Sequence, residues 1–361
     1  MIGLSSFSAV LLLLLAIPTL LGLAGVVYLT VKYTPVIIRI FQAQPLFMPL
    51  KVTPVERGES VDFQTADGLR LSGSYLRART EEQAGVIVYC HEYLSDRWSF
   101  CPYVDHLRDL GYDIFTFDFR NHGASDLDRT YAPLQWTTEH EIDDLRAALS
   151  FLRTRDDHDP AGVGLFGVSR GGTTALITAA TEPDVWGVVT DGAFPTQGTM
   201  VSYIVRWAEI YVPSEFLRSL IPMWLYGFLA RTARLCTERS LRCRFPSVEA
   251  AVSRLTPRPW LMIHGQRDTY IGPEIAQALF DRGEDPKELW LVPAAKHNRC
   301  RETAPEAYTA RLQDYLARFA PRRPLNETPE VISSAHRVIS SDFAHQLAPA
   351  LSREVAAPIP G

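Results

Sequence analysis

The sequence predicts an α/β fold in which helices cover both faces of a mostly parallel sheet, and two observations support this. Apolar runs typical of buried strands alternate with helical patterns along most of the chain, as a parallel sheet requires. One of these runs, residues 163–166, leads into the segment GVSRGG at residues 167–172. Gly-x-Ser-x-Gly between a strand and a helix is typical of a sharp turn that exposes a serine hydroxyl, with glycines where a Cβ would clash. Ser169 is therefore a candidate nucleophile.

The chain begins with a long apolar segment. Residues 1–31 contain no charged side chain, and residues 10–31 are apolar except for Thr19 and Thr30. A helix over residues 10–31 spans about 33 Å, enough for the hydrocarbon core of a bilayer. A cleaved signal peptide is the alternative, but no cation precedes the apolar run, and apolar residues continue past the small-residue site at 23–25. We therefore expect an uncleaved transmembrane anchor and juxtamembrane segment in residues 1–45.

Charge and cysteine usage indicate the surroundings of the rest of the chain. Lys32, Arg39 and Lys51 follow the apolar segment and no Lys or Arg precedes it, so the positive-inside rule predicts a single-pass membrane protein whose main domain faces the cytoplasm. Five cysteines, an odd number without a C-x-x-C pair, argue against a disulfide-built domain. A net charge of −5 gives no reason to expect a nucleic-acid partner.

Later elements are predicted in order along residues 46–321, which have the length of one large α/β domain. Thr138 and Glu141 form a capping-box pattern at the start of a helix. The other expected elements are an opening hairpin at 60–76, a strand and its loop at 86–93, strands at 260–264 and 288–292, and helices at 273–282 and 305–319. Residues 322–361 read as a linker and a tail with a modest amphipathic pattern.

Two candidate partners for Ser169 lie downstream. A serine hydroxyl becomes nucleophilic when a base removes its proton, and that base needs an acid to orient it. Asp268 and His297 each follow an apolar strand signal, in the chain order serine, acid, histidine. Both therefore fall at the carboxyl ends of strands, where open α/β sheets bind ligands. We predict a Ser169–His297–Asp268 triad, with Asp191 as the alternative acid and His264 as the alternative base.

With these motifs in place, residues 55–320 resemble the α/β-hydrolase superfamily. The opening hairpin, the Gly-x-Ser-x-Gly-Gly segment and the apolar N-terminus are more similar to membrane-anchored, Bem46-like serine hydrolases than to lipases. Residues 118–125 also look like that family's Asp-x-Arg-x-His-Gly-x-Ser segment, which we interpret as a structural turn. The resemblance implies an α/β-hydrolase fold with a helical lid between strands six and seven.

The resemblance also implies an oxyanion hole made of two backbone N–H groups. One is that of Arg170, directly after the nucleophile. The other comes from the loop after the strand at 86–90, where the family usually reads His-Gly and this chain has His91-Glu92. Glycine tolerates a positive φ that glutamate does not. Tyr93 is the first choice for this donor, and Glu92 is the alternative.

Substrate choice is expected to depend on residues 193–258, which are too long for a simple connection and are predicted to form the lid. Apolar side chains recur there at helical spacing, and they either pack the lid onto the domain, line an acyl-chain pocket or touch the bilayer. One such stripe is formed by Leu217, Ile221, Trp224, Leu225 and Phe228. The candidates for substrate contact are Trp207, Tyr211, Trp224 and Phe228. A basic cluster within residues 231–244 reads as a solvated helix face or as a contact for anionic lipid headgroups. The Arg170 side chain is a further candidate for attracting an anionic headgroup.

The combined hypothesis is a membrane-anchored serine hydrolase that cleaves an ester or thioester of a lipid or acyl-linked substrate, without metal or organic cofactor. A peptidase on the same fold and a non-catalytic binding protein are the alternatives. A lid rich in carboxylates would favour the peptidase, and loss of a triad residue would favour the binding protein. A transacylase differs only in excluding water, so the sequence does not separate it from a hydrolase.

Overall fold

A computed structural model describes residues 2–43 and 49–321, and the amphipathic pattern predicted in the C-terminal tail lies outside these residues. The described chain forms one eight-stranded sheet with strand order β1-β2-β4-β3-β5-β6-β7-β8. The strands are β1 Glu59–Gln64, β2 Arg70–Leu76, β3 Gly85–Cys90, β4 Tyr112–Phe117, β5 Val163–Val168, β6 Val185–Asp191, β7 Trp260–Gly265 and β8 Lys287–Val292. Strand β2 pairs antiparallel with β1 and with β4, and all other pairs are parallel. The predicted mostly parallel sheet is confirmed.

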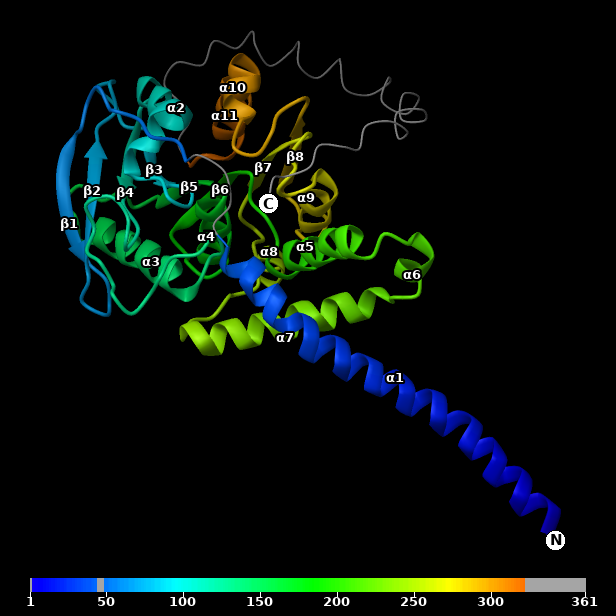
Figure 1. Cartoon of the computed structure of the whole chain (residues 1–361). Helices are drawn as coiled ribbons and strands as arrows, with labels where there is room; N and C mark the ends of the chain where they lie inside the picture. The colour runs from blue at the N-terminus through cyan, green and yellow to red at the C-terminus, as the bar shows by residue number, and fades with distance from the viewer. Residues whose placement is uncertain (1, 44–48, 322–361) are drawn as a thin grey trace, which may run out of the picture.

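Helices lie on both faces of this sheet, as Figure 1 shows. They are α1 Ile2–Gln42, α2 Phe100–Val104, α3 Glu139–Thr154, α4 Arg170–Ala179, α5 Thr196–Tyr211, α6 Glu215–Ser219, α7 Met223–Leu241, α8 Val248–Val252, α9 Pro273–Phe280, α10 Cys300–Thr303 and α11 Pro305–Phe319, with 3₁₀ helices η1 Arg97–Ser99 and η2 Asp105–Leu110. Helix α3 carries the predicted capping box between Thr138 and Glu141.

Two apolar cores lie on opposite faces of the sheet. Side chains alternate along each strand, so Val86 and Val88 of β3 join one core while Ile87 and Tyr89 join the other. The first core includes residues of α3, α4, α8 and α9, and the second includes residues of α2, η2 and α11. Tyr308, Leu312, Tyr315 and Leu316, the predicted stripe of the closing helix, are all buried. The core therefore fixes the strand ends, where the candidate catalytic residues lie.

The lid consists of α5, α6, α7 and α8, between β6 and β7. The sequence predicted one helical stripe through Leu217, Trp224 and Phe228, and this is wrong because Pro222 caps a new helix, α7. Leu217, Trp224 and Phe228 are exposed. The buried face of α7 is instead formed by Leu225, Tyr226, Leu229, Ala230, Ala233 and Thr237.

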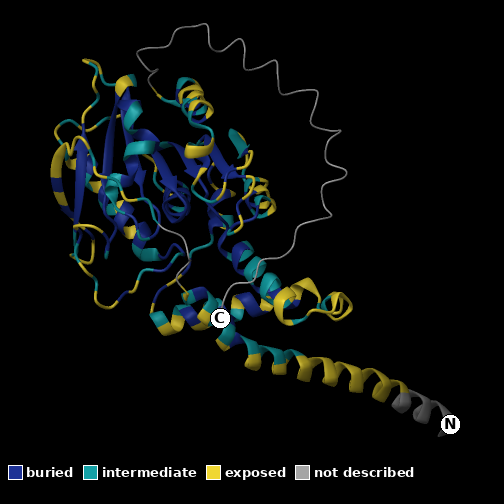
Figure 2. Cartoon of the chain, turned by 45° about the horizontal axis from the view of Figure 1, so that its top comes forward, coloured by how far each residue is buried: buried dark blue, intermediate teal, exposed yellow. Residues whose placement is uncertain are grey.

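Helix α1 has two different halves. Residues 11–25 are exposed, as the yellow ribbon in Figure 2 shows, and the stretch Leu11–Gln42 is long and apolar enough to cross a membrane. A transmembrane anchor and a signal sequence both satisfy that test. Its last turns pack against the lid, where Ile37 and Phe41 are buried in a third apolar cluster with Leu225 and Leu229 of α7. The helix that the sequence marked as an anchor is thus also part of the lid packing.

Candidate active site

Ser169 occupies a strained turn between β5 and α4. Its backbone has φ 50° and ψ −117°, which a residue with a Cβ adopts only when its surroundings enforce it. The N–H of Ser169 donates to the carbonyl oxygen of Asp191 at 2.7 Å. A Cβ on Gly167 would lie 2.4 Å from the carbonyl oxygen of Gly171, and one on Gly171 would lie 2.1 Å from that of Cys90. The two glycines therefore permit close backbone packing that fixes the serine.

Ser169, His297 and Asp268 form a continuous hydrogen-bonded chain. The Oγ of Ser169 lies 3.0 Å from Nε2 of His297, and Nδ1 of His297 lies 2.6 Å from Oδ2 of Asp268. An ionised carboxylate only accepts, so Nδ1 donates to Asp268 and Nε2 is left to accept the serine proton. The other carboxylate oxygen of Asp268 accepts the N–H groups of Tyr270 and Ile271 at 2.8 and 2.9 Å. The tertiary structure thus brings together three residues from the ends of β5, β7 and β8.

The electrostatics of Asp268 suit an orienting carboxylate. Burial raises the pKa of this carboxyl, but its Coulomb attraction to His297 and its hydrogen bonds more than offset burial, so its pKa lies below the usual value. A charged Asp268 stabilises the imidazolium that forms when His297 takes the serine proton.

Asp191 and His264, the alternative acid and the alternative base, make other contacts. The Oδ2 of Asp191 accepts a hydrogen bond from the hydroxyl of Tyr308 at 3.0 Å, and burial raises the pKa of Asp191 to about 6. His264 is buried, which lowers its pKa, and its Nε2 lies 2.9 Å from the carbonyl oxygen of Ile271. The direct contact with the serine hydroxyl is made by His297, and the direct contact with Nδ1 of His297 is made by Asp268.

The predicted oxyanion donors lie at the start of α4 and in the loop after β3. Arg170 is the first residue of α4, and N–H groups in the first turn of a helix have no partner within the helix. Tyr93 lies in a turn, with its side chain buried and its hydroxyl donating to the carbonyl oxygen of Pro133 at 3.1 Å. The residue with a positive φ in this loop is Leu94, at 62°, and not Glu92. Glutamate at this position is therefore compatible with the backbone.

Glu92 has a structural role that the sequence did not indicate. Its carboxylate is buried, and burial raises its pKa. Its Oε1 accepts the N–H of Leu50 at 3.1 Å, and the hydroxyl of Ser95 donates to the carbonyl oxygen of Leu50 at 2.6 Å. Glu92 thereby ties the chain segment after α1 to the loop that carries Tyr93.

The side chain of Arg170 is fully buried, which corrects its assignment as a contact for anionic headgroups. It donates to the carbonyl oxygen of Leu134 at 3.0 Å and lies 3.4 Å from a carboxylate oxygen of Glu141. It also lies 3.2 Å from Nε2 of His122, whose pKa burial lowers to about 3, so this neutral ring accepts the hydrogen bond. The guanidinium group packs 5.1 Å from the ring of Tyr93 and supports the oxyanion loop from inside the protein.

A cavity of about 20 Å³ adjoins the serine, which is room for a single water molecule. Besides Ser169 and His297 it is lined by Gln135, Trp136, Phe194, Thr199, Tyr203, Tyr270 and Ile271. The predicted substrate residues Trp207, Tyr211, Trp224 and Phe228 do not line it. Trp207 stacks on Tyr211 at 5.2 Å, and Tyr211, Trp224 and Phe228 are exposed.

Trp136 connects this cavity to α1. Its indole N–H donates to the carbonyl oxygen of Phe41 at 3.0 Å, and the two rings meet edge to face at 5.7 Å. Sequence reasoning missed Trp136 because an isolated aromatic residue before a helix cap belongs to no periodic pattern.

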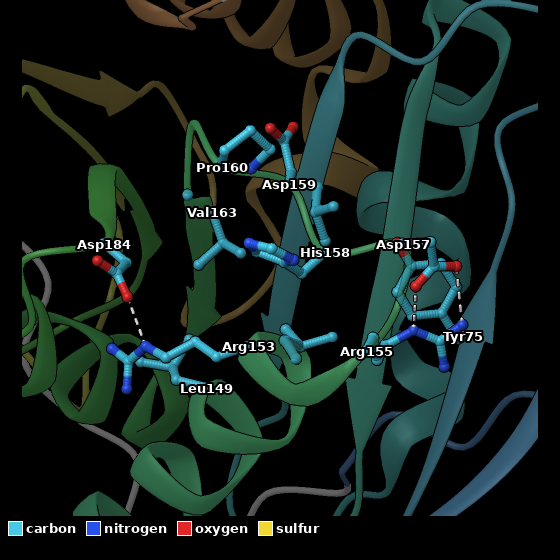
Figure 3. A pocket seen from close by; sticks show the side chains of 13 residues that line it. Tyr75, Leu149, Arg153, Arg155, Asp157, His158, Asp159, Pro160, Val163 and Asp184 are labelled. Carbon is cyan, nitrogen blue, oxygen red and sulfur yellow. Dashed lines mark hydrogen bonds and ion pairs between the residues drawn. The ribbon is translucent and has the colours of Figure 1, made fainter.

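A larger cavity of about 280 Å³ lies far from the serine, near the starts of β3 and β5. Two arginines in its lining pair with carboxylates that also line it, as the dashed lines from Arg153 to Asp184 and from Arg155 to Asp157 in Figure 3 indicate.

Three potential metal ligands also meet in the described chain, but a cation already lies among them. Asp67, Asp128 and His140 come within 4.8 Å of one another. The Nη1 of Arg120 lies 2.9 Å from Asp67 and 3.0 Å from Nδ1 of His140. The guanidinium group supplies the positive charge of this cluster, so the residues do not fit an additional metal ion.

Comparisons with known proteins agree with this architecture. A family model described as alpha/beta hydrolase fold matches residues 85–241. The uncharacterized protein YfhR of Escherichia coli K12 is 24% identical over 244 residues, covering 66% of this chain and 73% of YfhR. The thiohydrolase aneE of Aspergillus aculeatus is 32% identical over 127 residues, covering 35% of this chain and 38% of aneE.

Solved structures share the fold at low identity. The esterase Pf2001 of Pyrococcus furiosus superposes with a TM-score of 0.57 at 22% identity, covering 77% of this chain and 100% of that one. The alpha/beta hydrolase GrgF from Penicillium sp. sh18 has a TM-score of 0.52 at 18% identity, covering 73% and 98%. These comparisons show that the chain has the α/β-hydrolase fold, and its YfhR-like relatives are consistent with the Bem46-like resemblance.

Proposed function

We propose that this chain is a serine hydrolase that cleaves an ester or thioester through an acyl-enzyme. The observation that carries the proposal is the contact of Ser169 Oγ with His297 Nε2 at 3.0 Å, with His297 held in turn by Asp268 at 2.6 Å. A serine in a strained turn, next to an imidazole that a carboxylate orients, has what nucleophilic catalysis requires.

In the proposed reaction Ser169 attacks the substrate carbonyl carbon while His297 takes the hydroxyl proton. The negative oxygen of the tetrahedral intermediate accepts the N–H groups of Tyr93 and Arg170, each worth about 3 kcal/mol in such sites. His297 then protonates the leaving alcohol or thiol, and the acyl group stays on Ser169. Water, deprotonated by His297, releases the acid and restores the serine.

The substrate class follows from the walls of the site. Trp136, Phe194 and Ile271 supply an apolar lining beside Ser169, which suits an acyl group better than a charged peptide terminus. We therefore propose a lipid or acyl-linked substrate. The likeness to a thiohydrolase over part of the chain favours including thioesters.

The location of the chain in a membrane is part of the same proposal. The apolar part of α1 that begins at Leu11 would cross a membrane, and Lys32, Arg39 and Lys51, which follow the apolar residues, would keep the hydrolase domain in the cytoplasm. Protease treatment of sealed spheroplasts tests this orientation: the domain should be protected. Its digestion from outside would reverse the orientation.

A fluorophosphonate probe tests the proposed chemistry without knowledge of the substrate. The detergent-solubilised chain should be labelled, Ser169→Ala should abolish labelling, and His297→Ala should strongly reduce it. Absence of labelling in a folded wild-type chain would contradict the proposal. A panel of acyl esters, thioesters and peptides then tests the substrate class, and activity on peptides alone would favour the peptidase alternative.

A further inference from the structure

The outer end of the lid carries an exposed apolar patch, here called the lid tip (residues 210–228). Its members include Tyr211, Phe216, Leu217, Leu220, Trp224 and Phe228, with Phe216 70% and Trp224 61% exposed. In the described chain, the exposed large apolar side chains that belong to neither α1 nor the lid tip are Val55, Leu127 and Leu235. Most such side chains therefore gather on one short segment, as expected of an interaction surface.

Helix α6, in the middle of the lid tip, contributes little to the packing of the domain. Helix α6 has no buried residue and lies between the ends of α5 and α7. Its cap is Ser214, and Pro222 ends the connection to α7. The apolar side chains of α6 thus stabilise neither the sheet nor the lid core, and their exposure to water is unfavourable unless another apolar phase covers them.

The position of α1 indicates that the apolar phase covering α6 is a membrane. Figures 1 and 2 both show α6 projecting from the domain on the side toward which the exposed part of α1 extends. Helix α7, whose first residues belong to the lid tip, packs against the last turns of α1 through Leu225 and Leu229. Any membrane that α1 enters is therefore on the side of the lid tip.

We propose that the lid tip inserts into the bilayer that α1 crosses, as a second membrane contact of this chain; this rests on the membrane-crossing α1 of the proposed function. Tyr211 and Trp224 suit this position because tyrosine and tryptophan rings favour the membrane–water interface. The lid, which closes over Ser169, would then be held directly at the surface from which an acyl-linked substrate leaves the membrane.

Tryptophan quenching tests this insertion without requiring activity. The full chain is reconstituted into phosphatidylcholine vesicles with brominated or unbrominated acyl chains, together with Trp224→Phe and the control Trp98→Phe, which alters a tryptophan of η1 on the domain. Brominated chains should quench the wild-type emission, and Trp224→Phe should lose a large part of that quenching while Trp98→Phe loses none. Equal quenching in the two variants would overturn the proposal, as would shielding of Trp224 by a second copy, seen as lid-tip cross-links between chains in detergent.

A second pair of variants tests the consequence for substrate access. Phe216→Glu combined with Leu220→Glu should lower hydrolysis of an acyl ester in vesicles several-fold and leave hydrolysis of a short soluble ester unchanged. Val55→Glu, at an exposed apolar residue outside the lid, is the matched control and should change neither rate. Equal loss on both esters would overturn the proposal. If the wild type cleaves neither ester, the proposed function fails, and the quenching result alone decides the membrane contact.

Discussion

The carboxyl edge of the sheet and the lid above it are built in opposite ways. At the sheet edge, Ser169, His297 and Asp268 are held by hydrogen bonds between 2.6 and 3.0 Å and by backbone groups of the neighbouring loops. In the lid, packing is apolar and ends abruptly at α6, whose large side chains face outward. The comparison indicates that polar contacts fix the reacting groups, while apolar contacts with α1 position the cover over them.

The largest effect is expected at the sheet edge, from Asp268→Asn. The amide can no longer accept from Nδ1 of His297 as the carboxylate does and would favour the wrong tautomer, so kcat should fall by about 10⁴-fold. Steady-state kinetics on any cleaved ester measures this. Asp191→Asn is the matched control and should keep most of the activity; the reverse result would make Asp191 the working acid.

Breaking the attachment of the lid to α1 should lower the stability of the protein and not its catalytic rate. Phe41→Ala removes a fully buried ring from the α1–lid cluster, and such changes typically cost about 3 kcal/mol or more. The thermal midpoint in detergent should fall and limited proteolysis should cut within the lid sooner. Val31→Ala, on the exposed side of α1, should leave both measurements unchanged. An unchanged midpoint in Phe41→Ala would mean that the lid does not depend on α1.

The buried Asp191 gives the sheet edge a pH dependence. Its folded-state pKa of about 6 exceeds the usual 3.8, so the protonated form favours the folded state. That stability is fully present below pH 3.8 and is lost as the pH rises through 6. Between pH 4 and 7 the wild type should therefore lose about 3 kcal/mol relative to Asp191→Asn. Denaturant unfolding at both pH values checks this, and parallel behaviour of the two proteins would contradict the raised pKa.

Glu92 ties the segment after α1 to the sheet edge, and its removal should have a smaller effect. Glu92→Ala leaves the N–H of Leu50 without its buried acceptor, which costs about 1–3 kcal/mol and loosens the loop carrying Tyr93. Glu92→Gln keeps an acceptor oxygen and should restore most of the probe-labelling rate. Equal rates in the alanine and glutamine variants would show that the tie to Leu50 does not matter for the site.

The smallest effect on stability is expected at the lid tip. Leu220→Ser alters a side chain that is 63% exposed, and such surface changes stay within about 0.5 kcal/mol. Thermal unfolding in detergent measures it. A large loss would mean that α6 belongs to the packed lid after all.

Local sequence patterns were sufficient to predict much of the fold. Gly167, Ser169 and Gly171 encode their turn because only glycine fits the two close backbone approaches. Strand and helix periodicity predicted the parallel sheet and the buried stripe of α11, because these patterns depend on which face meets the core. Chain order and strand-end positions also placed Ser169, Asp268 and His297 together.

Only the tertiary structure decided the contacts between distant segments. Trp136 reaches Phe41, Glu92 holds Leu50, and Arg170 turns inward to Glu141, and none of these contacts leaves a periodic signal in the sequence. The predicted lid stripe failed because Pro222 begins a new helix with a different buried face. By itself the sequence determined the fold class and the candidate triad, since these depend on local turns and alternation. The tertiary structure decided which surfaces meet, because that depends on packing between residues far apart in the chain.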